Sequence, residues 1–123
     1  MIKLRITGPV PRKAPYVKFR CVLYVPKDVR KWRARLAKAF LKAGGRVPAK
    51  GERLWASYHY GFVKSHADHD SITHSAQDAL SKDALKCSDK EWFISGVSSV
   101  RVPNKRDEFI QISVDYRKDA SGE

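Results

Sequence analysis

The chain has 123 residues and a formal net charge of +12 at pH 7, from 25 Lys and Arg against 13 Asp and Glu. This length suits a single domain with one hydrophobic core, and no apolar run is long enough to cross a bilayer. The opening residues do not resemble a signal peptide, and the two cysteines, Cys21 and Cys87, are too few for a disulfide framework or a zinc site, so we expect reduced thiols in a cytoplasm-like compartment.

The first half of the chain predicts a strand, an extended segment and a helix. Residues 1–7 alternate apolar and charged side chains, as a half-buried strand does. The proline-rich loop that follows carries Arg12 and Lys13, and residues 16–25 are rich in β-branched and aromatic residues. A basic amphipathic helix is expected from Asp28 to the Gly44-Gly45 pair, because apolar residues recur at helical spacing between them.

The second half predicts three more strands and one more helix. Residues 53–63 alternate, with Leu54, Ala56, Tyr58, Tyr60 and Phe62 on one face. A helix is expected over 71–82, and strands over 92–102 and 109–116, with residues 103–107 as a hairpin loop. We therefore predict one α+β domain over 1–118, a small mixed sheet packed by two main helices, and a disordered tail over 119–123.

Charge is divided unequally along the chain. Residues 1–67 hold 17 Lys and Arg against Asp28 and Glu52, a net charge of +15, whereas residues 68–123 have a net charge of −3. The basic half favours a polyanion, most simply nucleic acid. The candidate phosphate contacts are Arg12, Lys13, Arg30, Arg33, Lys38, Lys42 and Lys64. The alternatives are a solubilising surface or a basic RNA-binding or ribosome-associated protein.

Three aspartates are candidate metal ligands. Asp68 and Asp70 are two residues apart at a strand end and point to the same side, and Asp89 follows nineteen residues after Asp70. The helix over 71–82 rises ~18 Å, and an extended 83–89 reaches ~23 Å. Asp89 therefore completes either its own subunit's site or a partner's. Carboxylate oxygens suit Mg²⁺ or Mn²⁺, although Asp70 as a helix cap, and Asp68 and Asp89 as loop and turn residues, fit the spacing too.

The run Asp68-His69-Asp70-Ser71-Ile72, followed by Asp78-Ala79-Leu80, Ser88-Asp89 and Ile94, is similar to the signature of the RusA family of Holliday junction resolvases. That signature has an Asp-x-Asp that opens a helix, an Asp-Ala-Leu late in it and an Asp-Asp pair before a strand. The order of the strands and of the basic helix over most of the chain resembles the family too.

This resemblance implies that Asp68, Asp70 and Asp89 are the catalytic metal-binding carboxylates, with Mg²⁺ or Mn²⁺ as cofactor. It also implies a homodimer whose two sites nick opposite strands of a four-way DNA junction symmetrically, in recombination or repair in a bacterial or phage-infected cell. A two-fold dimer matches the near two-fold symmetry of such a junction.

The chain departs from the family at several places. His74 stands where the family has a catalytic Lys, Ser71 replaces an Asn, and Ser88 replaces the first Asp of the pair. Lys64-Ser65-His66-Ala67 replaces an Arg-rich stretch that often precedes the first Asp. We expect His74 either to act as a pH-sensitive catalytic group or to be a surface residue of a weak or inactive junction-binding protein. Asp78 is expected to pair with His74 one helical turn away.

Two further interpretations concern His and aromatic residues near the acidic motif. His59, His66 and His69 allow a zinc or manganese site, but they lack the usual ligand spacing. Trp55, Tyr58 and Tyr60 allow base stacking, but alternating aromatic residues in a strand are more typical of a core or a dimer interface.

Overall fold

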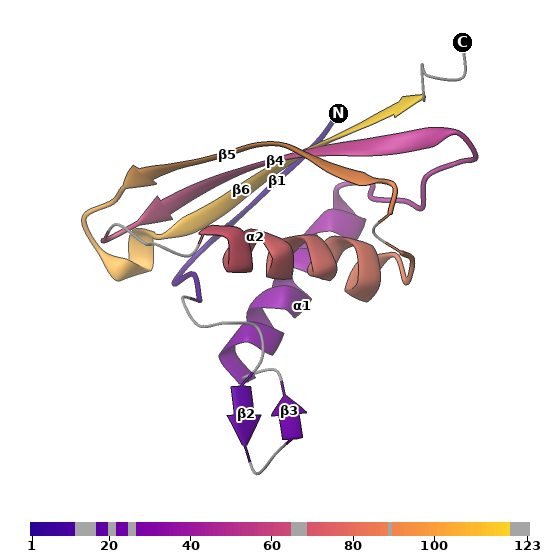
Figure 1. Cartoon of the computed structure of the whole chain (residues 1–123). Helices are drawn as coiled ribbons and strands as arrows, with labels where there is room; N and C mark the ends of the chain where they lie inside the picture. Colours follow the sequence, from indigo (N-terminus) through magenta and orange to yellow (C-terminus); the bar gives the residue numbers. More distant parts are fainter. Residues whose placement is uncertain (12–16, 20–21, 25–26, 65–68, 89, 119–123) are drawn as a thin grey trace.

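The computed structural model describes residues 1–11, 17–19, 22–24, 27–64, 69–88 and 90–118 (Figure 1). In chain order the elements are β1 (Ile2–Thr7), β2 (Val17–Phe19), β3 (Val22–Tyr24), α1 (Lys27–Lys42), β4 (Glu52–Phe62), α2 (His69–Asp78), the π-helical segment η1 (Ala79–Ala84), β5 (Trp92–Arg101), the 3₁₀ turn η2 (Lys105–Asp107) and β6 (Phe109–Lys118). The predicted α+β class is confirmed.

Four strands form one mixed sheet in the order β1-β6-β4-β5. β6 pairs antiparallel with both β1 and β4, whereas β4 and β5 are parallel, with Leu54 opposite Trp92 and a register shift between Ala56 and Ser57. The predicted mixed sheet is therefore confirmed. β2 and β3 form a separate antiparallel pair, so the segment expected only to be extended contains a small hairpin.

The predicted hairpin between the last two strands is wrong. β5 and β6 are not neighbours, because β4 lies between them. The Val102 N–H still donates to the Phe62 carbonyl at 2.9 Å, so the chain stays beside β4 before the connection with η2 crosses to β6. Turn-forming residues at 103–107 mark a change of direction, but the strand partners are set by packing across the whole sheet.

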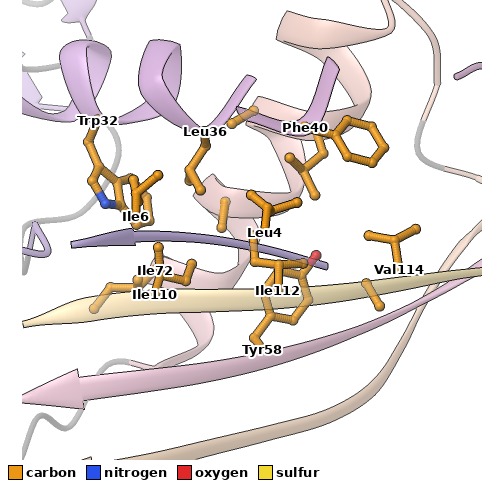
Figure 2. Close-up of a cluster of buried hydrophobic side chains, with 14 of the residues drawn as sticks. Leu4, Ile6, Trp32, Leu36, Phe40, Tyr58, Ile72, Ile110, Ile112 and Val114 are labelled. Carbon is orange, nitrogen blue, oxygen red and sulfur yellow. The ribbon is translucent and has the colours of Figure 1, made fainter. Parts of the chain in front are cut away.

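Both helices lie on the same side of the sheet (Figure 1), and the hydrophobic core lies between the helices and the sheet. Figure 2 shows Trp32 and Leu36 of α1 directed towards the sheet. The ring of Phe40 packs against Trp92 at the start of β5, with ring centroids 6.0 Å apart. The buried residues that line this core include Leu4, Ile6, Leu54, Ala56, Tyr58, Tyr60, Phe62, Ile72, Ala76, Leu80, Ile110, Ile112 and Val114. Among the residues described, no helix is long and apolar enough to cross a membrane.

The predicted stop of α1 at the glycine pair is confirmed. Gly44 has φ +104°, a left-handed conformation that glycine adopts without strain. Its N–H donates to the Leu41 carbonyl, and the Gly45 N–H donates to the Phe40 carbonyl at 2.8 Å. A Cβ at Gly45 would lie 2.7 Å from the Phe40 ring, so a side chain there would displace a core aromatic residue.

Candidate active site and basic surface

The acidic motif falls at the start of α2, the helix that follows β4. The backbone of Asp70 lies in the first turn of α2, but its side chain, like those of His69 and Ser71, is not among those described. Asp68 and Asp89 lie outside the described residues. The structure therefore places Asp70 along the helix and leaves the proposed three-carboxylate cluster a prediction.

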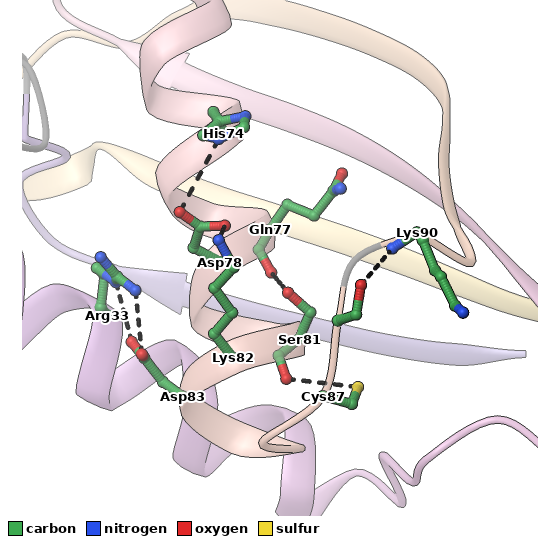
Figure 3. A network of polar contacts seen from close by, with 10 residues as sticks. Arg33, His74, Gln77, Asp78, Ser81, Lys82, Asp83, Cys87 and Lys90 are labelled. Atoms are coloured by element: carbon green, nitrogen blue, oxygen red, sulfur yellow. Dashed lines mark hydrogen bonds and ion pairs between the residues drawn. The ribbon is translucent and has the colours of Figure 1, made fainter.

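His74 lies one helical turn after Asp70, on the same face of α2. Its side chain is 66 % exposed, and its Nε2 lies 4.0 Å from Oδ2 of Asp78 (Figure 3). The predicted pairing of His74 with Asp78 is confirmed. Lys82 approaches the same carboxylate, with Nζ 3.4 Å from Oδ1. Positions 70, 74, 78 and 82 thus alternate acidic and basic residues at four-residue spacing.

Asp78 is held in a buried setting. Its side chain is 7 % exposed, because Ile72, Ala76 and Leu80 turn this part of the helix against the sheet. The hydroxyl of Tyr58 is also buried, and burial, Tyr60 and then the Asp78 carboxylate raise the pKa of Tyr58. The helix widens into the π segment η1 directly after Asp78, a feature frequent at functional sites.

Arg33 is not an exposed phosphate contact. It is buried, and its guanidinium donates two hydrogen bonds to Asp83 of η1, at 2.9 and 3.0 Å (Figure 3). The helical spacing explains this placement, because Arg33 lies four residues after Val29 and three before Leu36, both of which are buried. Arg33 connects α1 to η1, and we therefore no longer count it among the predicted DNA contacts.

The other predicted contacts on α1 are accessible. Arg30, Lys38 and Lys42 are exposed, and none has an ion pair among the residues described. Lys31 is exposed as well and lies seven residues before Lys38, on the same helix face. Lys31 is absent from the contacts predicted above, and its seven-residue spacing from Lys38 is the sequence signal that identifies it. Lys64 is exposed just after β4, and Arg12 and Lys13 lie outside the described residues.

The residues on either side of Asp89 lie away from the start of α2. α2 alone carries the chain about 15 Å at ~1.5 Å per residue, and η1 extends it further beneath the sheet (Figure 1). Beyond η1, the Lys90 N–H donates to the Ser88 hydroxyl, and the Glu91 carbonyl accepts the N–H of Leu54 near the beginning of β4. In the chain, α2 begins seven residues after Phe62, the last residue at the other end of β4.

The structure also places the residues of the two alternative sites, the aromatic stacking surface and the histidine metal site. Tyr58 and Tyr60 are core residues, whereas Trp55 stacks on Phe93 with ring centroids 4.7 Å apart. His59 Nδ1 lies 2.7 Å from the Ser98 hydroxyl, and His66 lies outside the described residues. The described part of the chain contains no group of three His, Cys, Asp or Glu residues positioned to hold a metal ion.

Comparison with protein-family models, and with curated proteins, found no match to this chain.

Proposed function

We propose that the protein is a Mg²⁺-dependent, structure-selective DNA endonuclease that resolves four-way junctions by paired symmetric nicks. The observation that carries this proposal is the arrangement on α2. An exposed His74 lies one turn after Asp70, and the buried Asp78 pairs with it one turn further along the helix. An acidic position for a metal and a group able to meet a phosphate then share one helix face. The place of action is the cytoplasm of a bacterial or phage-infected cell.

Asp68, Asp70 and Asp89 would hold the cation, since their carboxylate oxygens are the donors that Mg²⁺ prefers and Mn²⁺ also accepts. The bound ion would polarise the scissile phosphate and activate water. In this proposal the protonated His74 ring donates a hydrogen bond to the phosphate, while its Nε2 lies 4.0 Å from Oδ2 of Asp78.

The exposed cations of α1 supply the affinity for DNA. Arg30, Lys31, Lys38 and Lys42 have no counter-charge among the described residues, so phosphate groups can replace their small counterions without breaking an internal ion pair. This contact carries no base information, and it fits an enzyme that recognises the shape of branched DNA.

We further propose a homodimer in which Asp89 of the partner subunit completes each site. This choice is supported by Ser88 and Lys90, which follow η1 and lie close to Glu91, whose carbonyl accepts the N–H of Leu54 near the beginning of β4, whereas Asp70 lies in the first turn of α2. β5 is an edge strand with four exposed large apolar residues, which suits self-association: Phe93, Ile94, Val97 and Val100.

A catalytically weak or inactive junction-binding protein of the same fold is the second candidate. The specific observation in its favour is that His74, Ser71 and Ser88 replace the residues of the active family. Both candidates share the basic surface and differ only in chemistry.

The deciding experiment incubates end-labelled four-way junction and linear duplex with the protein and Mg²⁺. Paired nicks at symmetric positions in the junction, with the duplex left intact, support the nuclease. Tight junction binding without nicks favours the binding protein, and no preference for the junction contradicts both.

A further inference from the structure

A pocket of about 330 Å³ lies at the end of the sheet where β4 finishes and β6 begins. Among the described residues it is lined by Val63, Lys64, Lys105 and Glu108. In Figure 1 the ends of β4 and β5, the turn η2 and the start of β6 gather at this end of the sheet. The pocket therefore combines segments more than forty residues apart in the chain, which only the folded sheet brings together.

Glu108 fixes the walls of this pocket. Its side chain is fully buried, and its carboxylate accepts the Val63 N–H at 2.9 Å and the Val10 N–H at 3.2 Å. Its own N–H donates to the Lys105 carbonyl at 3.2 Å. Because a buried carboxylate is stable only when it is hydrogen-bonded, Glu108 holds the segment that precedes Lys64 and the turn that carries Lys105 in fixed positions.

The rim of the pocket is cationic. Lys64 and Lys105 are both exposed, and neither has an ion pair among the residues described. Arg101 and Arg106 are exposed on the adjoining connection, where Asp107 accepts a hydrogen bond from the Asn104 amide at 3.2 Å. The Glu108 carboxylate already accepts two backbone N–H groups, so the ammonium groups are what the pocket presents to a ligand.

We propose that this pocket binds a phosphate group of the DNA backbone, with Lys64 and Lys105 as its ligands and Glu108 as the residue that positions them. The inference rests on the proposed function and deepens it, because Lys64 precedes the first residue of α2 by five residues, a span of at most ~18 Å. The pocket would thus bind DNA near the acidic end of α2, at a place separate from the contacts made by α1.

The test compares Lys64→Gln, Lys105→Gln and the double variant with Lys50→Gln, an exposed lysine just before β4 at the opposite end of the strand. Binding of fluorescent four-way junction is measured without Mg²⁺ over a series of salt concentrations. Each pocket variant is expected to make the log–log salt dependence shallower by about 0.9, and the double variant by about 1.8, if the contacts are to duplex arms. Lys50→Gln should match the parent.

If both single variants keep the salt slope of the parent, the pocket does not bind a DNA phosphate, whether or not the protein nicks DNA. A failure of the parent to bind the junction would overturn it too. A reduced slope in a protein that never nicks would uphold the pocket and contradict only the proposed nuclease. A shallower slope for Lys105→Gln with an unchanged slope for Lys50→Gln would likewise uphold the proposed phosphate site, and it would leave the nuclease proposal untouched.

Discussion

Arg33 of α1 and Asp83 of η1 are joined by two parallel hydrogen bonds, from Nε at 2.9 Å and from Nη2 at 3.0 Å. They come from segments fifty residues apart and connect the basic helix to the widened end of α2. A bidentate pair of this kind fixes direction as well as distance. The charge of Arg33 therefore serves the fold, whereas the neighbouring charges of α1 face solvent.

The Arg33→Met variant should lose stability without losing DNA affinity. Removal of the guanidinium leaves Asp83 without its partner, and because the Asp83 side chain is 39 % exposed we expect a loss of about 1–2 kcal/mol in the free energy of unfolding. Urea denaturation measures this loss. The matched comparison is a Lys38→Gln, Lys42→Gln double variant, which should keep its stability and bind junction with a salt slope shallower by about 1.8. A shallower salt dependence of junction binding for Arg33→Met would show that Arg33 does contact DNA.

Asp70→Asn should abolish nicking and leave junction binding intact or stronger. The amide keeps the shape of the side chain but removes the charge that attracts a divalent cation and repels phosphate. Nicking of labelled junction and anisotropy titrations measure the two effects separately. Asp115→Asn is the control, since Asp115 lies on β6 and pairs with Arg117 at 2.6 Å. Cleavage retained in a folded Asp70→Asn protein would remove Asp70 from the site.

A mixture of two inactive variants should regain activity if Asp89 acts across the dimer. In a heterodimer of Asp70→Asn and Asp89→Asn chains, both substitutions then fall in one site and leave the other whole. Co-expression with two different tags isolates this heterodimer, which should nick one strand of the junction and not make the symmetric pair. If each chain completes its own site, the heterodimer has no intact site and stays inactive, which would show that Asp89 works in its own subunit.

The sequence predicted the elements well where a local period decides them. β4 alternates apolar residues from Leu54 to Phe62, and all five of its inward residues are buried. His74 and Asp78 were paired correctly for the same reason, since four-residue spacing on a helix is a local relationship. The order of β5 and β6 was not predictable in this way, because the position of β4 between them depends on the packing of the whole sheet.

Side-chain roles that depend on distant residues were also missed. Arg33 and Arg30 look alike in the sequence, and only Asp83, fifty residues away, distinguishes them. In the sequence Lys105 is an ordinary turn residue, and only the fold shows that it lines the same pocket as Lys64 and Glu108. The sequence signal is Glu108 itself, an acidic residue directly before an apolar strand, which needs hydrogen-bond partners if it is buried.

Acid should weaken the fold partly through Glu52. The hydrogen bonds from Arg46 and from the Ala49 N–H lower the pKa of Glu52 to about 2. Between the ordinary pKa of a glutamate, ~4.3, and this value, the unfolded chain binds more protons than the folded one, so stability falls as the pH falls through that window. Glu52→Gln should be less stable than the parent at pH 7, and the gap should narrow towards pH 2. Thermal unfolding at a series of pH values measures it, and a constant gap would contradict this role.

The replacement of the family's Lys by His74 predicts an unusual dependence of nicking on pH. Histidine changes charge in the physiological range, whereas lysine stays charged there. If the protonated ring contacts the scissile phosphate, nicking by the parent should decline relative to a His74→Lys variant as the pH rises from 6 to 8.5. His74→Ala should be slow at every pH, with about a 10²-fold loss if the group acts in proton transfer.

The comparison must be made between variants at each pH, because a metal-activated water ionises more readily as the pH rises and opposes the loss of the His charge. If His74→Ala nicks as fast as the parent throughout this range, His74 is a surface residue, and another cation near the end of β4 must meet the phosphate.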